Sequence, residues 1–259
     1  MSTPTSRCRL IGVGEIDLEP QAIAIIHARG GSKRIPLKNL RELAGKPLLA
    51  YPIELCQQCS WIQRIIVSTD HDAIMQAAKR YGAEVPFRRP ADISEDVPSE
   101  LVTEHALKFL AEQGDLLPEF AVTLTPATPL TRVEQLEKAF HLLQAHPAWD
   151  SVTTVRRSRE HPEWMLVLDV NDGEVRTLLG NPLDGEYNVS QNLKPFYYPT
   201  GAFWINRITR FLQHPSLYGA RWGAVVQQPE EGVDIDLPED LERANAILSR
   251  LRSSRKMTG

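Results

Sequence analysis

The chain has 259 residues, of which 42% are hydrophobic and 24% are charged, and its formal net charge is −4. This length and composition favour one large globular domain, with or without a small lobe, and exclude a disordered or fibrous protein. A weakly acidic chain has no general attraction for nucleic acid, so positive charge can act only where it is concentrated.

Residues 1–20 are predicted to be a polar extension ahead of the first strand. They carry Glu15, Asp17 and Glu19 and lack the apolar core of a signal peptide. No apolar run in the chain approaches the ~20 residues that a membrane-spanning helix needs. We therefore expect a cytoplasmic protein with neither a membrane nor a nucleic-acid partner.

A strand at residues 23–26 runs directly into Gly30 and Gly31 and then into a cluster of basic side chains. Four consecutive aliphatic or Ala residues suit a strand that is buried on both faces. The glycines let the backbone pass close to a ligand, and the cations of the loop are Arg29, Lys33, Arg34 and Lys38. We interpret this segment as a phosphate-binding loop. Its spacing matches neither the P-loop nor the GxGxxG motif, and a solvated basic turn is the alternative.

Helices and strands then alternate along the chain. We expect helices at 47–59, 71–82, 98–113 and 132–145, and strands at 62–70, 83–87 and 120–124. Asp70 is a candidate N-cap of the second helix and Gly82 its C-terminal stop. The alternation predicts an α/β fold, with an open, mostly parallel sheet flanked by helices. Cys56 and Cys59 fall in the first helix without a second Cys or His pair, so we interpret them as structural.

The pattern changes at about residue 151, where strands follow one another without long helices between them. These strands are expected at 151–155, 164–170, 174–178 and 200–206, and Asn171-Asp172-Gly173 is a hairpin signal. We therefore expect a small β-rich lobe, at about residues 156–206, inserted in a domain of residues 21–259. A strand at 222–227 and a helix from 237 to about 252 return to the first pattern.

Two aspartates near the end of the chain are candidates for a metal site. Asp234 and Asp236 alternate about Ile235, so in an extended segment both carboxylates point to one side. Carboxylate oxygens together with substrate phosphates suit Mg²⁺. The alternative is that Asp236 caps the following helix, and spacing alone leaves both readings open.

Several blocks of the sequence resemble, in order, those of the acylneuraminate cytidylyltransferases, which make CMP-activated nonulosonic acids from CTP. The most specific block is the basic loop at residues 28–40, followed by Gly45-Lys46-Pro47-Leu48. The other blocks lie at 66–70, 85–90, 124–130, 161–164, 198–203 and 233–241. The resemblance implies a nucleotide-diphospho-sugar transferase-like variant of the Rossmann fold.

The resemblance also implies a reaction and the residues that carry it. CTP and a 2-keto sugar acid would be the substrates and Mg²⁺ the cofactor, with Asp234 and Asp236 as metal ligands. Arg29, Lys33 and Asp236 are expected to be catalytic. Residues expected to bind the nucleotide are Ala28, Arg29, Gly30, Ser32, Lys33, Lys38 and Asn39, and those expected to face the sugar are Thr125, Trp164, Ser190 and Gln191.

Several positions depart from the family pattern, including an arginine displaced to Arg132 and Lys194 in place of proline. His27 stands where the family usually has proline, Thr125 where it has glutamine, and Ser190 where it has arginine. The last two face the sugar in the family, so the sugar acid stays open, and 3-deoxy-octulosonic acid is an alternative to a nonulosonic acid. A nucleotide-dependent oxidoreductase would need GxGxxG, which is missing, and a non-catalytic binding protein would have no need of the paired aspartates, which are present.

The expected lobe is rich in aromatic side chains, which include Trp164, Phe196, Tyr197 and Trp204. A small β-rich insertion cannot easily bury both faces of its strands unaided. These side chains could fold back on the parent sheet or pack against another chain. The resemblance implies the second arrangement, a homodimer in which each lobe closes over the partner's sugar site.

Overall fold

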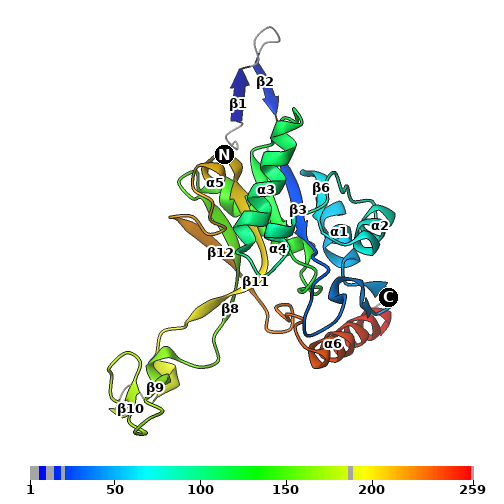
Figure 1. Ribbon diagram of the computed structural model, residues 1–259. Coiled ribbons are helices and arrows are strands. Elements are labelled where there is room, and N and C mark those ends of the chain that lie inside the picture. The colour runs from blue at the N-terminus through cyan, green and yellow to red at the C-terminus, as the bar shows by residue number, and fades with distance from the viewer. Residues whose placement is uncertain (1–5, 10–14, 19–20, 186–188, 258–259) are drawn as a thin grey trace.

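The computed structural model describes residues 6–9, 15–18, 21–185 and 189–257. Six strands form the central sheet (Figure 1), in the spatial order β12, β8, β11, β7, β3 and β6. Their bounds are β3 Ala22–His27, β6 Ile62–Ser68, β7 Phe120–Leu124, β8 Ser151–Arg157, β11 Tyr197–Arg207 and β12 Trp222–Gln227. Within this sheet β11 runs antiparallel to both of its neighbours and the other pairings are parallel. The expected mostly parallel α/β sheet is confirmed.

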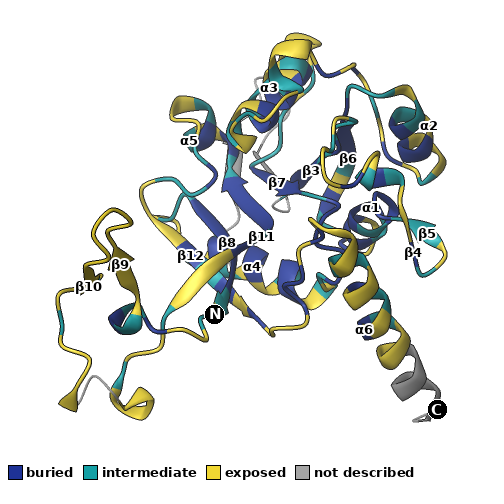
Figure 2. Ribbon diagram, turned by 60° about the horizontal axis from the view of Figure 1, so that its bottom comes forward, coloured by how far each residue is buried: buried dark blue, intermediate teal, exposed yellow. Residues whose placement is uncertain are grey.

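Helices cover both faces of the sheet, as its apolar strands require. Helices α1 (Ala50–Gln57), α2 (Asp72–Arg80) and α4 (Val133–Ala145) pack on the face that carries Ala24 and Ile26. Helices α3 (Ser99–Glu112) and α5 (Ile208–Gln213) pack on the face that carries Ile23 and Ile25. Figure 2 shows the buried strands between these helices. Residues 23–26 are buried on both faces, as their sequence predicts.

A third apolar cluster joins the two ends of the chain. Helix α6 (Pro238–Met257) contributes Ala244 and Ile247, the preceding segment contributes Val233 and Ile235, and the basic loop contributes Ile35. A short hairpin of β4 (Glu42–Leu43) and β5 (Lys46–Pro47) lies between the loop and α1. This cluster fixes the segment that carries Asp234 and Asp236 beside the basic loop.

The local structure differs from expectation at several places, and part of the N-terminal extension is structured. Residues 83–87 form no strand, since Glu84 makes a single bridge to Ile66 and Pro86 lacks the N–H that a longer ladder needs. Asp70 does not cap the second helix, which begins at Asp72 after His71. Part of the N-terminal extension is structured, because β1 (Ser6–Arg9) and β2 (Glu15–Leu18) pair as an antiparallel hairpin. The remainder of residues 1–20 lies outside the described residues.

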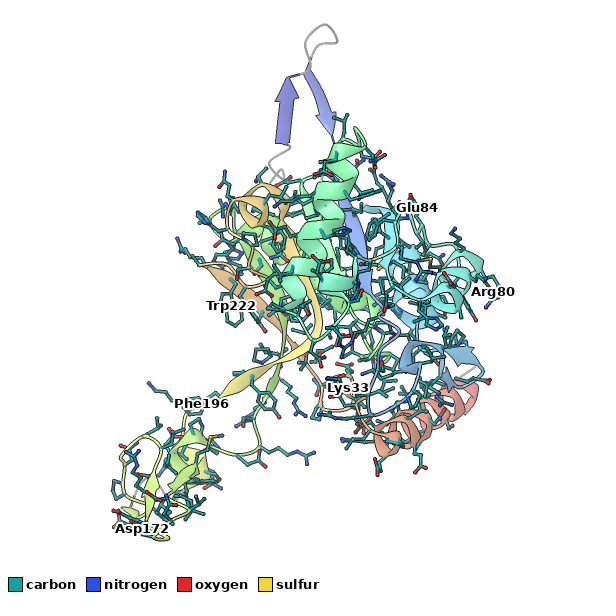
Figure 3. All side chains as sticks on the ribbon, in the orientation of Figure 1. Lys33, Arg80, Glu84, Asp172, Phe196 and Trp222 are labelled. Carbon is teal, nitrogen blue, oxygen red and sulfur yellow. The ribbon has the colours of Figure 1, made fainter. Side chains whose placement is uncertain are left out.

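The lobe is smaller than its expected span of 156–206. Strand β8 and the second half of β11 belong to the central sheet. The first half of β11 extends beyond β7 and forms with the end of β8 a ribbon that leads to the lobe, and β12 flanks this ribbon as far as Arg156. The lobe contains a hairpin of β9 (Leu166–Leu168) and β10 (Val175–Thr177), and Trp164, the first residue of the strand expected at 164–170, ends a 3₁₀ turn at Pro162–Trp164. Asp172 and Phe196 mark this lobe in Figure 3, where it projects away from the body.

The two cysteines of the CxxC pair are free thiols buried under the sheet. Burial raises the pKa of Cys59 to about 12 and that of Cys56 well above its usual value. Because the thiolate is the reactive form, both side chains are unreactive at neutral pH. The structural interpretation of this pair is confirmed.

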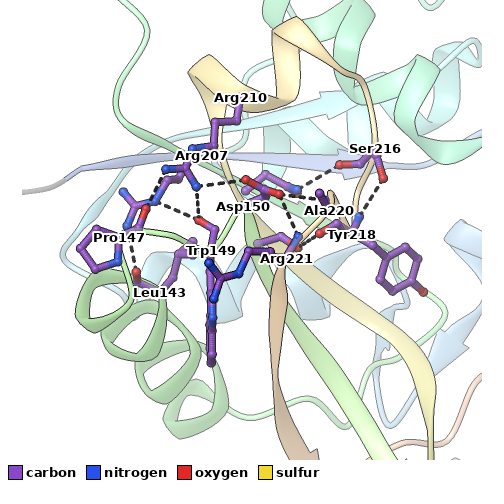
Figure 4. A network of polar contacts seen from close by, with 12 residues as sticks. Leu143, Pro147, Trp149, Asp150, Arg207, Arg210, Ser216, Tyr218, Ala220 and Arg221 are labelled. Carbon is purple, nitrogen blue, oxygen red and sulfur yellow. Dashed lines mark hydrogen bonds and ion pairs between the residues drawn. The ribbon is translucent and has the colours of Figure 1, made fainter.

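Asp150 organises a polar corner at the end of the sheet where β8 and β12 begin (Figure 4). Its carboxylate accepts hydrogen bonds from the N–H groups of Ala220 and Arg221, at 2.8 and 3.0 Å, and from Arg210 at 3.0 Å. Beside it, the Trp149 ring covers Gly223, where an added Cβ atom would lie 1.9 Å from a ring carbon. The corner therefore has no space for a side chain at position 223 of β12.

We predict that Gly223→Ala destabilises the protein because the new methyl group must displace the Trp149 ring. Overpacking of this kind costs about 1–3 kcal/mol in the free energy of unfolding. Urea denaturation measures the loss, and Gly31→Ala is the matched control, since an added Cβ there meets no atom within 4 Å. Equal stability of the two variants would contradict the packing described here.

Candidate functional site

The carboxyl ends of β3, β6 and β7 meet at one edge of the sheet, where the loops that follow them enclose two adjoining cavities. The first has a volume of about 290 Å³ and the second of about 330 Å³. Residues Arg29, Ser32, Lys38 and Asp96 line both cavities. The first cavity extends to His27, Arg89 and Thr125, and the second to Lys33, Arg34 and Asp236. This is the position at which open α/β sheets bind ligands.

The glycine loop is held in shape by its neighbours. The N–H of Gly30 donates to the Asp70 carboxylate at 2.7 Å, and an added Cβ atom at Gly30 would lie 2.8 Å from that of His71. Asn39 donates from Nδ2 to the carbonyl of Arg29 at 2.8 Å, so this buried amide fixes the start of the loop. Ala28 is fully buried, and its contribution to the site is main-chain only.

Asp96 pairs with two of the cations expected to bind phosphate. Its carboxylate contacts the Arg29 guanidinium and lies 2.8 Å from Nζ of Lys33. The hydrogen bond from Lys33, then that from Arg29, lowers the pKa of Asp96, and the same Lys33 contact raises the pKa of that lysine. The acidic loop after residue 88 thus places the Asp96 carboxylate as a counter-ion against the cations of the basic loop.

Lys38 connects the basic loop to the paired aspartates. Its Nζ donates to the carbonyl of Ile235 at 2.6 Å and to the carboxylate of Asp236 at 3.1 Å. Arg34 contacts the other oxygen of Asp236 at 3.2 Å. The segment is also fixed from the far side, because the N–H of Ile235 donates to the carbonyl of Ala127 at 2.8 Å.

The paired aspartates suit a divalent cation. Ile235 is fully buried while Asp234 and Asp236 are exposed, as their alternation predicts. Desolvation by the surrounding protein, and then the Asp236 charge, raise the pKa of Asp234 to about 6, although Lys38 acts in the opposite direction. A further positive charge would relieve this repulsion. The described residues form no group of three or more acidic, His or Cys ligands, so phosphate and water would have to complete the shell of a Mg²⁺ ion.

Asp236 does not cap helix α6. Asp240 accepts the hydrogen bonds of the free N–H groups of Asp236 and Leu237, at 3.0 and 2.8 Å. The Asp236 carboxylate points instead to Arg34 and Lys38. The alternative reading of this residue as a helix cap is therefore wrong.

Arg89, for which the sequence alone suggests no role, is buried in the wall of the first cavity. Its guanidinium donates to the hydroxyl of Ser68 at 3.1 Å and to the carbonyl of that residue at 2.6 Å. Desolvation lowers its pKa to about 10, so it remains a cation at neutral pH. The sequence marks this position only by the two adjacent arginines that follow residue 87. Of these, Arg89 lines the cavity.

Of the residues expected to face the sugar, Thr125 alone lines the first cavity. Trp164, Ser190 and Gln191 belong to the lobe, and among the described residues none of them lines either cavity of its own chain. Figure 3 shows the same separation, with Lys33 on the body and Phe196 and Asp172 toward the lobe. A single chain therefore does not bring the two sets of residues together.

Across the described residues, no helix has both the length and the apolar character needed to cross a membrane.

Comparison with known proteins gives a family match and curated relatives. The sequence matches the cytidylyltransferase family over residues 23–256. It is 32% identical to the CMP-N,N'-diacetyllegionaminic acid synthase of Legionella pneumophila, over 84% of this chain and 92% of that protein. It is 31% identical to the N-acylneuraminate cytidylyltransferase of Escherichia coli, over 89% of this chain but only 52% of that longer protein.

The fold is also similar to a solved structure. CMP:2-keto-3-deoxy-manno-octonic acid synthetase, complexed with CTP, superposes with a TM-score of 0.65. The alignment covers 89% of this chain and 99% of that one, with 17% sequence identity. At this identity the likeness establishes the shared α/β fold.

We predict that Asp96→Asn strengthens the binding of inorganic tripolyphosphate, because it frees Arg29 and Lys33 from their intramolecular partner. Exposed ion pairs are weak, so the expected gain is roughly threefold to tenfold at low salt and smaller at high salt. Calorimetry measures it. Glu95→Gln removes the same charge one position away and is the control. An equal gain in both variants would mean that only net charge matters.

We also predict a pH dependence of stability that arises at His27. Burial, and secondarily the charge of Arg89, lower the pKa of this histidine to about 3, whereas an unfolded chain gives about 6.5. Between these values the unfolded state binds more protons, so stability falls as the pH falls from about 6.5 toward 3. The slope is up to about 1.4 kcal/mol per pH unit.

The variant His27→Gln should flatten this slope in urea denaturation series between pH 4 and 7. His141→Gln is the control, since His141 is exposed on α4. Slopes that are equal in the wild type and in His27→Gln would contradict the burial of a neutral imidazole.

Proposed function

The chain belongs to the cytidylyltransferase family, and from this premise we propose that it transfers the CMP group of CTP to the anomeric hydroxyl of a nonulosonic acid. One observation carries the proposal. A loop with Arg29, Lys33 and Lys38 shares a cavity with Asp236 at the carboxyl edge of the sheet, and Asp234 lies two residues before it. Cations for a triphosphate and acidic ligands for its counter-ion are what transfer at phosphorus requires.

In this reaction the hydroxyl oxygen of the sugar acid forms a bond to the α-phosphorus of CTP. The bond from that phosphorus to the bridging oxygen breaks, pyrophosphate leaves, and the hydroxyl proton is released. Arg29 and Lys33 would hold the triphosphate, while Lys38 would place it against the segment of Asp236. Asn39 would act through the carbonyl of Arg29, which it already binds. The chain's task is to position the reactants and to balance phosphate charge.

We include Mg²⁺ as the cofactor. Asp234 and Asp236 would hold the ion together with phosphate oxygens of CTP, and the ion would supply positive charge against the phosphate oxygens. The pKa of Asp234, which desolvation and then the Asp236 charge raise, supports this assignment, because a bound cation would stabilise both carboxylates.

The choice of a nonulosonic acid rests on the curated relatives, whose names specify diacetyllegionaminic acid and N-acylneuraminic acid. The alternative, a 3-deoxy-octulosonic acid, is favoured only by a structural likeness at 17% identity. Free buried thiols also suit a reducing compartment, which supports a cytoplasmic location.

The direct test is to incubate the purified protein with CTP, Mg²⁺ and a panel of sialic, legionaminic, pseudaminic and 3-deoxy-octulosonic acids while pyrophosphate release is followed. We expect release with at least one nine-carbon acid and none with any acid when EDTA is present. Release with 3-deoxy-octulosonic acid alone would mean that this acid, and not a nonulosonic acid, is the substrate. No release with any acid would refute the enzyme function.

We predict that Asp236→Asn and Asp234→Asn each lower kcat by roughly 100-fold or more, as expected for preorganised charges at a reacting phosphate. Both side chains are exposed, so the fold should persist, and circular dichroism checks it. Glu239→Gln removes a nearby exposed carboxylate from the first turn of α6 and is the control. Near-native turnover of Asp236→Asn at low Mg²⁺ would contradict the metal assignment.

We further propose that the protein is a homodimer whose lobes cover each other's sugar sites. The lobe hairpin has no core of its own, because every residue of β9 is exposed. Its exposed apolar side chains are Met165, Leu166, Val167, Leu168, Val170, Val175, Leu178, Leu179 and Leu183. An isolated two-stranded hairpin with this much apolar surface needs a cover. A second chain could supply this cover. Trp164, Ser190 and Gln191 of each lobe would then lie at the cavity of the partner chain.

The dimer predicts complementation between two inactive chains. One carries Asp236→Asn, and the other carries Trp164→Ala with Gln191→Ala in the lobe. Random pairing makes about half the dimers mixed, each with one intact site, so about a quarter of wild-type activity should return on co-expression. A monomer by light scattering, or no recovery in a purified mixed dimer, would refute the exchange of lobes.

A further inference from the structure

His27 is a polar side chain of the first cavity that the proposed reaction does not use. It is the last residue of β3 and lies beside Arg89 on the wall of this cavity. Its Nε2 atom lies 3.0 Å from the hydroxyl of Thr103 on α3. That hydroxyl lies 2.9 Å from the hydroxyl of Thr123 on β7. Both threonines are fully buried, so a chain of contacts from α3 and β7 fixes the imidazole ring at the end of β3.

Within the part of the chain that the structure describes, Nδ1 of the fixed ring has no hydrogen-bond partner and is available to a ligand. A neutral imidazole carries one donor and one acceptor, and Nε2 is engaged by Thr103. Burial beside Arg89 keeps the ring neutral, with a pKa of about 3. Nδ1 is therefore an acceptor if Nε2 donates to the Thr103 hydroxyl and a donor if Nε2 accepts from it, and the ring stays neutral between about pH 5 and 9.

The arrangement of the two cavities indicates which part of a nucleotide lies near this ring. Lys33 and Arg34 line the second cavity, which suits the triphosphate. The first cavity shares Arg29 and Lys38 with it, and its mostly polar lining also includes the apolar side chains of Val97 and Val102. A flat heteroaromatic ring suits apolar walls with a few polar groups at its edge. The nucleoside of a triphosphate bound in the second cavity would therefore extend into the first, toward His27.

We propose that His27 determines which nucleobase the site accepts, through a hydrogen bond between Nδ1 and the edge of the pyrimidine, in a ring orientation fixed by Thr103 and Thr123. This inference rests on the proposed function. With Nδ1 as the acceptor, the ring pairs with the 4-amino group of cytosine, whereas the 4-keto group of uracil would meet a second acceptor unless the ring changes tautomer and the Thr103 hydroxyl reverses its role. His27 acts here as a specificity residue, and Thr103 positions it.

The test compares two amides at position 27. His27→Gln keeps a polar atom near Nε2 and loses the one at Nδ1, whereas His27→Asn keeps a polar atom near Nδ1. Dissociation constants for CTP, UTP and inorganic tripolyphosphate are measured by calorimetry without sugar acid. We expect the preference for CTP over UTP to fall about tenfold in His27→Gln and to be largely kept in His27→Asn. Tripolyphosphate binding should stay within about twofold of the wild type in both.

Controls separate this role from a structural one. His141→Gln, at an exposed position of α4, should change none of the three constants. Thr103→Val leaves the imidazole but removes its tether, so the CTP preference should fall by a smaller factor and return in Thr103→Ser. If a His27 variant fails to fold, the comparison of Thr103→Val with Thr103→Ser tests the inference instead. An unchanged CTP preference in His27→Gln, or an equal loss of tripolyphosphate binding, would overturn the inference.

The outcomes also separate this inference from the proposed function. If the wild type releases pyrophosphate with a sugar acid but His27→Gln keeps its CTP preference, only the role of His27 fails. If no acid is turned over but CTP preference depends on His27 as described, the transfer reaction fails and the nucleobase contact stands.

Discussion

The contact between Lys38 and the segment of Ile235 and Asp236 holds the candidate site together. One ammonium group binds a main-chain carbonyl and a carboxylate from almost 200 residues further along the chain. The apolar cluster of Ile35, Val233 and Ile247 buries the surrounding backbone and so keeps this contact in place. Without it the basic loop and the paired aspartates would be separate features at two ends of the chain. With it they face one space, where a bound phosphate would meet both charges.

Features that depend on neighbouring residues could be predicted from the sequence. Strands 120–124 and 222–227 begin and end where their apolar patterns do, because every residue of the first is buried and the second alternates. The basic loop is also a local feature, since glycines, cations and a preceding buried strand lie within one short segment. Most of the expected nucleotide-side residues, including Arg29, Ser32 and Lys38, accordingly line the cavities.

What the sequence could not supply are pairings between distant segments. The position of β11 between β7 and β8 depends on its register with each of these strands. The sequence of residues 197–207 alone specifies neither register. Asp70 had the right residue type for a helix cap, but the N–H of Gly30 lies closer to its carboxylate. Arg89 and Thr103 became part of the site only through burial beside β6 and β3. Long-range contact decided each of these cases over local preference.

The ribbon that carries the lobe limits how the lobe can change in evolution. Between Pro199 and Trp204 the register of β11 against β8 shifts, and Gly201 takes a positive φ of 70° there. Side chains alternate between the faces of a ribbon, so an insertion or deletion of one residue beyond this bulge would exchange its two faces. A change of two residues would lengthen or shorten the ribbon and keep its faces. Among descendants of this chain, length variants of the stem should therefore accumulate in even steps.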